Sequence, residues 1–346
     1  PVLLLLLVAS LVPIWVGERF PSQNGPWYLL IVHMLKELGN PQWDYSQYYE
    51  INWHPVPHML YEVLLWSLTY VAPLLTAEKL ALSICAVLVP ASIFYFLSVV
   101  APDKLLMGYL SFLMIHTHSF YRGYHDFVLS VPLFFFVLGF WYRHRNRIGP
   151  KVCAALAVGA VAIYLAHLFT FAILVATVGL VRLIETRSLR KAVWSTVCCT
   201  WPGWLLFVDF LLLALTHPGG FVLADTSFLL PHEATENFVR KMFYSISFPG
   251  YVVATLPWLW LVYGLARRFV VARADGRLLK SILSDPLLVA TLTLCVLYFF
   301  VPDKFLGWHY VAIRMTPLIL GLALPCVAQL ASTNLVRTAF VMTVCG

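Results

Sequence analysis

The stretch "GERFPSQNGPWYLL", residues 17–30, places charged and amide groups directly after a run of sixteen almost wholly apolar residues. A carboxylate in such a place can act as general base toward an acceptor hydroxyl, which makes Glu18 a candidate catalytic residue. Its neighbour Arg19 can bind an anionic substrate, and Asn24 can hydrogen-bond one. An interfacial ion pair between Glu18 and Arg19 is the competing interpretation.

The stretch "NPQWDYSQYYEINWHPVPH", residues 40–58, interleaves acidic and imidazole groups with five aromatic residues. Aromatic faces and carboxylates suit sugar rings and their hydroxyls, although the same composition is typical of any loop at a membrane surface. Asp44 and Glu50 are therefore further candidate bases, and His54 is a candidate substrate-binding residue.

Three later residues are also candidates for substrate binding. His125 follows "HTHSFYRGY", and His167 lies within "AIYLAHLFTFAIL", where a polar side chain is costly unless it faces a cavity or a partner. Arg314, in "GWHYVAIRMTP", can clasp phosphate with two parallel hydrogen bonds, or it can snorkel to the interface.

Metal binding is conceivable near His125, because His116, His118 and Asp126 lie close to it in the sequence. The spacing matches no standard metal motif. We therefore assign no metal ligand and leave open whether the protein uses a divalent metal as a cofactor.

Composition sets the class of the protein. The chain has 346 residues, of which 61% are hydrophobic and 11% are charged, and its apolar runs approach the length of ~20 residues that crosses a bilayer. These features predict an all-α polytopic membrane protein and give no sign of a nucleic-acid partner. The seven cysteines all lie in apolar runs and are expected to be core residues. The first residue is Pro1, and we expect the sequence to be a window on a longer protein.

The apolar runs predict a single transmembrane domain over residues 1–346, with about 9–11 membrane helices. Full spans are expected over residues 1–16, 58–75, 78–100, 125–142, 191–216, 250–266, 284–301 and 313–333, with a last apolar stretch from Val336. The long first outer loop, residues 17–57, contains an amphipathic pattern over Trp27 to Leu38. The second outer loop, residues 217–249, contains another from His232.

Three clusters of basic residues, at 143–151, 182–191 and 267–280, decide how two apolar runs of unusual length are interpreted. The run 104–117 is too short for a full span, and the run 151–183 is longer than one span needs. The positive-inside rule places all three clusters in the cytoplasm if 104–117 is a re-entrant half-helix and 151–183 is a hairpin broken around "YLAHLFTF". The candidate site segments then share the outer face, around a polar cavity. One long tilted helix over 151–183 with a spanning 104–117 is the alternative, and it leaves one basic cluster on the wrong side.

Several motifs resemble one family. "NGPWYLLIVHMLKEL", "YYEINWHPVPHMLYEVLL", "LLTAEKLAL", "FYRGYHDFVLSVPLFFF" and "YLAHLFTFAIL" resemble an uncharacterised group of bacterial polytopic proteins related to the GT-C class of membrane glycosyltransferases. The resemblance implies a GT-C-like helical bundle that transfers a sugar from a polyprenyl-phosphate donor to an acceptor outside the cytoplasm. It gives the base role to an acidic residue of the first outer loop and the phosphate role to a late basic residue such as Arg314.

One departure leaves the function open. The related group tends to carry Asp directly before Gly-Pro, where this chain has Asn24, and an amide cannot serve as a general base. Either Glu18, Asp44 or Glu50 acts as the base, or the chain is a non-catalytic GT-C-derived subunit that binds lipid and scaffolds membrane protein partners. A transporter or haem-binding protein finds little support, because inverted repeats are not visible and paired histidines on two full spans are not evident. The expected location is the bacterial inner membrane, with the functional face outside the cytoplasm.

Overall fold

The protein is helical almost throughout, as its composition predicts. The computed structural model describes residues 2–216, 226–240, 248–274, 276, 278–305 and 308–327. Within these ranges the only strands are a two-residue antiparallel pair, β1 (Lys304–Phe305) and β2 (Trp308–His309). Parts of the predicted second outer loop, residues 217–225 and 241–247, lie outside the described residues, as does the apolar stretch from Val336.

Four helices are long and apolar enough to cross a membrane: α4 (Leu74–Val100), α6 (His125–His144), α8 (Leu168–Thr186) and α9 (Leu189–Thr216). Shorter apolar segments are α1 (Val2–Trp15), α3 (Met59–Leu68), α7 (Pro150–Ala166), α13 (Pro286–Tyr298) and the run formed by η3 (Ala312–Arg314), α14 (Met315–Ala323) and η4 (Leu324–Cys326). These apolar helices are compatible with a membrane protein. Whether the shorter ones also span stays a prediction.

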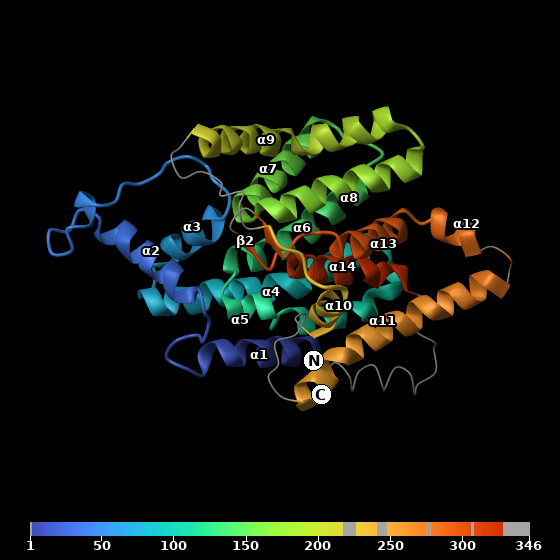
Figure 1. The fold of residues 1–346 in the computed structure, drawn as a ribbon, viewed down its shortest axis with the longest axis horizontal. Helices are drawn as coiled ribbons and strands as arrows, with labels where there is room; N and C mark the ends of the chain where they lie inside the picture. The colour runs from blue at the N-terminus through green and yellow to red at the C-terminus, as the bar shows by residue number, and fades with distance from the viewer. Residues whose placement is uncertain are drawn as a thin grey trace.

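The core of the bundle lies around α6, which packs against both α4 and α14 (Figure 1). Glycines allow the close approach: a Cβ on Gly139 of α6 would lie 2.9 Å from the Tyr95 ring of α4, and a Cβ on Gly321 of α14 would lie 2.1 Å from the Phe135 ring. Every residue of α14 is buried. α9 lies at one edge of the bundle, against α7 and α8, and α1 lies at the opposite edge (Figure 1).

The apolar run 151–183 is broken at His167, as the hairpin interpretation requires. α7 ends at Ala166 and α8 begins at Leu168, while His167 between them has extended backbone angles of φ −164° and ψ 116°. The alternative of one continuous helix over this run is therefore wrong. Residues 102–114 form the 3-10 helix η2 (Pro102–Met114), and its predicted re-entrant placement in the membrane stays a prediction.

The predicted first outer loop, residues 17–57, contains the expected amphipathic helix, α2 (Gly25–Glu37), followed by a 3-10 turn, η1 (Tyr45–Gln47). α2 buries Tyr28 and Val32 and exposes Trp27 and Leu30. α2 therefore packs on the bundle through Tyr28 and Val32, while Trp27 and Leu30 of the amphipathic pattern face away from it. Beyond α2 the loop extends away from the bundle (Figure 1).

The remaining described helices lie around this frame. They are α5 (His118–Arg122), α10 (Pro231–Arg240), α11 (Phe248–Ala274) and α12 (Leu278–Leu283). α10, from the second predicted amphipathic segment, packs against α11.

The predicted membrane topology can be tested by labelling single cysteines introduced into a cysteine-free background. Because basic clusters stay in the cytoplasm, positions beside Arg145, Arg187 and Arg273 should react from the cytoplasmic side. Positions beside Asp44 and Glu233 should react from outside. Reaction of the Arg145 and Arg187 positions from opposite sides would contradict the topology.

Candidate functional site

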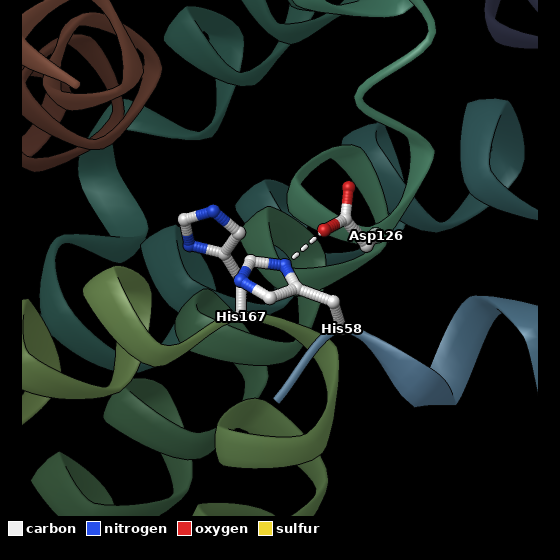
Figure 2. A group of neighbouring side chains, drawn as sticks. All are labelled: His58, Asp126 and His167. Carbon is white, nitrogen blue, oxygen red and sulfur yellow. Dashed lines mark hydrogen bonds and ion pairs between the residues drawn. The ribbon is translucent and has the colours of Figure 1, made fainter. Parts of the chain in front are cut away.

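Four polar side chains from four separate segments meet inside the bundle. His58 comes from the segment before α3, Asp126 from the first turn of α6, His167 from the break between α7 and α8, and Arg314 from η3. Asp126, His167 and Arg314 are buried, and the side chain of His58 is 31% exposed. Figure 2 shows three of them, with the His58 ring between Asp126 and His167. We call these four residues the polar cluster.

The Asp126 carboxylate organises one half of the polar cluster. One oxygen, Oδ2, accepts a hydrogen bond from Nδ1 of His58 (Figure 2). The other, Oδ1, accepts a hydrogen bond of 2.9 Å from the hydroxyl of Tyr28. Burial and the Asp126 charge raise the pKa of Tyr28 well above its usual value, so its hydroxyl stays protonated and donates. Because Nδ1 of His58 is hydrogen-bonded to the Asp126 carboxylate, which only accepts, the neutral ring has its proton on Nδ1 and its lone pair on Nε2.

The Arg314 guanidinium organises the other half. Its Nη1 donates to Nε2 of His167 over 2.8 Å, and its central carbon lies 4.6 Å from the centre of the Tyr124 ring, a cation–π contact. The Nε group is buried and has no hydrogen-bond partner within the described residues. A buried cation with an unused donor can bind an anion.

Backbone turns bring the polar cluster together. His58 has the left-handed angle φ 77°, which is uncommon for a residue with a side chain and is associated with functional sites. Pro55 and Pro57 restrict the chain just before it. On the other side, the turn at Gly123, with φ 79°, ends α5 and starts the chain toward α6.

The Gly123 turn also binds the segment that follows α1. The backbone N–H groups of Gln23 and Asn24 donate to the carbonyls of Tyr121 and Arg122, each over 3.1 Å. The Arg122 side chain then bonds the Gln23 amide oxygen and donates to the Tyr310 hydroxyl over 2.9 Å. This docking fixes the start of α2 and so brings Tyr28 to Asp126. We call it the loop clamp.

An apolar cavity of about 410 Å3 is lined by residues that are close in the sequence to two members of the polar cluster. Its lining begins at Leu168, the residue after His167, and includes Val311, three residues before Arg314. The other walls are aromatic, formed by Phe169 and Phe171 of α8 and by Trp204 and Phe207 of α9. The cavity is wholly apolar and suits an apolar chain.

His58, Asp126 and His167 offer metal-ligand atoms within 4.8 Å of one another. A metal ion needs the lone pair of a ring nitrogen, however, and Nε2 of His167 already accepts from Arg314. The Arg314 guanidinium would also repel a divalent cation beside it. The arrangement therefore fits a hydrogen-bonded network better than a metal centre.

Two of the residues predicted from the sequence lie in the polar cluster, His167 and Arg314. His125 is buried, with both ring nitrogens lacking hydrogen-bond partners among the described residues, and its ring lies 5.5 Å from that of Tyr28 and 5.0 Å from that of Tyr61. It is enclosed by aromatic rings and does not join the hydrogen bonds of the cluster.

The other predicted residues lie between α1 and α3, in residues 17–57. Glu18, Arg19, Asp44 and Glu50 are exposed there. His54 is exposed and lies 3.8 Å from the Asp209 carboxylate of α9, while Asn24 is partly buried and its contact with the Gly123 turn is through its backbone. Sequence reasoning did not single out the His58–Asp126 pair or Tyr28. The available signal was the "HPVPH" motif, in which two prolines fix the approach to His58.

No protein-family model matches the chain, and neither a curated protein nor a solved structure matches it. The interpretation of the site therefore depends on its own geometry.

Replacing Gly123 by Ala should disrupt the loop clamp. The new Cβ would lie 2.7 Å from the backbone nitrogens of both Asn24 and Gly25, and a left-handed Ala also costs about 1 to 2 kcal/mol. Gly276→Ala is the matched control, because Gly276 also has a positive φ, 63°, with open space around the added Cβ. Thermal unfolding in detergent should show a larger loss of stability for Gly123→Ala. Equal losses in the two variants would show that the clamp contributes nothing.

Proposed function

We propose that the protein is a membrane glycosyltransferase that moves a sugar from a polyprenyl-phosphate donor to an acceptor hydroxyl on the extracytoplasmic side of the bacterial inner membrane. Two observations carry the proposal: the buried Arg314 guanidinium has an unused Nε donor, and a wholly apolar cavity is lined by Leu168 and Val311, which are close to His167 and Arg314 in the sequence. The resemblance to the GT-C class supplies the reaction type.

The donor would bind Arg314 with its phosphate and the apolar cavity with its lipid chain. Its phosphate would pair with Arg314, whose planar guanidinium matches phosphate oxygens in a two-pronged geometry. The start of its polyprenyl chain would enter the cavity lined by Phe169 and Phe207, where burial of apolar surface stabilises it by about 25 cal/mol per Å2. The polar cluster offers one guanidinium against one carboxylate, so a bound phosphate is not faced by excess negative charge.

His58 is the best-placed base for the transfer. Its Nε2 would take the proton of the acceptor hydroxyl as the hydroxyl oxygen bonds to the anomeric carbon. The bond between that carbon and the phosphate oxygen would break, and the electron pair would leave with the lipid phosphate, whose charge Arg314 stabilises. Asp126 would hold the imidazole in the required tautomer. Glu18, Asp44 and Glu50 are the competing bases, and they are more exposed than His58.

A non-catalytic membrane subunit is the second candidate function, favoured by the surface of α9. This helix exposes large apolar side chains along its length, among them Trp194, Trp201 and Leu212. A surface of this kind packs either against lipid or against partner helices. Such a subunit would bind a lipid without turning it over.

The donor site is tested by binding of a polyprenyl phosphate to purified protein in detergent. Arg314→Ala should weaken binding at least tenfold, because a charge-assisted contact in a buried site contributes about 1.5 to 3 kcal/mol. Arg314→Lys should also weaken it, since the charge remains while the two-pronged geometry is lost. The exposed Arg19→Ala is the control and should bind normally. Unchanged binding in both Arg314 variants would refute the donor site.

The base is tested by sugar transfer from a polyprenyl-phosphate sugar, with His58→Gln and Glu18→Gln compared. His58→Gln should lower turnover by about 10²- to 10⁴-fold with donor binding largely kept, because an amide cannot take up the acceptor proton. Glu18→Gln should retain turnover. The reverse result would give the base role to Glu18. No turnover by the parent protein, together with its recovery only in complex with other subunits, would favour the scaffold function.

A further inference from the structure

His167 is joined to two hydroxyl groups behind it, away from Arg314. Its Nδ1 lies 3.4 Å from the Thr170 hydroxyl, which lies 2.7 Å from the Ser130 hydroxyl of α6. The Ser130 hydroxyl donates to the carbonyl of Phe127 over 2.6 Å. Thr170 and Ser130 are fully buried, and neither belongs to the proposed reaction.

The donor and acceptor of every hydrogen bond from His167 to Phe127 follow from the contact of His167 with Arg314. A guanidinium has donors and no acceptor, so Nε2 of His167, 2.8 Å from Nη1, must accept. The ring is then neutral, with its single proton on Nδ1. The backbone N–H of Thr170 also lies 3.4 Å from Nδ1, but a protonated Nδ1 cannot accept from it. The Nδ1 proton is therefore directed to the Thr170 hydroxyl, Thr170 donates to Ser130, and Ser130 donates to Phe127.

We infer that Thr170 and Ser130 are positioning residues for the anion site, because they hold His167 in the tautomer that accepts from Arg314. This inference rests on the proposed function, in which Arg314 binds the donor phosphate. If Nδ1 lost its acceptor, the ring would gain by moving its proton to Nε2 and accepting from the Thr170 backbone. The Arg314 contact would then place two donors face to face. Arg314 would lose its anchor and its orientation toward the phosphate.

The test is a double-mutant cycle on polyprenyl-phosphate binding, with Thr170→Val and Arg314→Ala. Valine keeps the branched shape of threonine and removes the hydroxyl. Thr170→Val alone should weaken binding about three- to tenfold, the range expected for one net hydrogen bond. In the Arg314→Ala background, Thr170→Val should have no further effect, since Thr170 acts only through Arg314.

Matched variants separate positioning from general damage to the helix. Thr177→Val removes a buried hydroxyl of the same helix that bonds only its own turn, at the Ile173 carbonyl over 2.7 Å, and it should bind normally. Thr170→Ser should restore binding. Ser130→Ala should weaken binding less than Thr170→Val, because Thr170 keeps the oxygen that accepts from Nδ1 and loses only the acceptor that orients its hydroxyl. Ser92→Ala is its control, because the Ser92 hydroxyl bonds within its own turn of α4.

The outcomes distinguish the two proposals. Normal binding by Arg314→Ala overturns the proposed donor site and this inference with it. Weak binding by Arg314→Ala with normal binding by both Thr170→Val and Ser130→Ala overturns the positioning role alone. Additive losses in the double mutant also overturn it, because they show that Thr170 acts independently of Arg314. If Thr170→Val does not fold, the same cycle with Ser130→Ala decides the matter.

Discussion

The organisation of the candidate site depends on one buried carboxylate. An unpaired carboxylate in an apolar interior would cost far more free energy than the fold could sustain, so Asp126 must be supplied with hydrogen-bond partners. Tyr28 and His58 supply them from segments that are distant in the sequence. Asp126 therefore holds together three segments: helix α2, the residues before α3 and the start of α6.

The second half of the site is built around a charge of opposite sign. Arg314 lies at the start of an entirely buried run and is held by a ring face, Tyr124, and a ring nitrogen, His167. Both polar halves occur where helices begin or break. Helix ends leave backbone groups and irregular geometry that polar side chains can use, whereas the middle of an apolar helix offers neither. The long apolar helices therefore form the frame, and the chemistry lies at their interruptions.

Much of this frame could be predicted from the sequence. The long apolar runs indicated α4, α6 and α9 to within a few residues. The length of the run 151–183 and the basic clusters on either side of it indicated a break around "YLAHLFTF", which contains His167. His167 could be nominated because an imidazole within an apolar run is costly, and Arg314 because a guanidinium can clasp phosphate with two hydrogen bonds. Their contact could not be predicted, because nothing local relates positions 147 residues apart.

Other features were hidden for different physical reasons. Tyr28 looks like one of many interfacial aromatics, and only the orientation of α2 decides that it, and not Trp27, faces the bundle. The acidic residues of the first loop drew attention because carboxylates are obvious bases. His58 was less conspicuous, since its role depends on Asp126, a partner 68 residues away.

The loop clamp is made largely by main-chain atoms. The N–H groups of Gln23 and Asn24 make the contacts with the Gly123 turn, and the Asn24 side chain makes no capping bond to α2. An amide and a carboxylate at position 24 would therefore dock the segment equally well. The loop clamp therefore tolerates changes of the side chain at position 24. Such a change could remove or add chemistry at that position during evolution, while Tyr28 keeps its place beside Asp126.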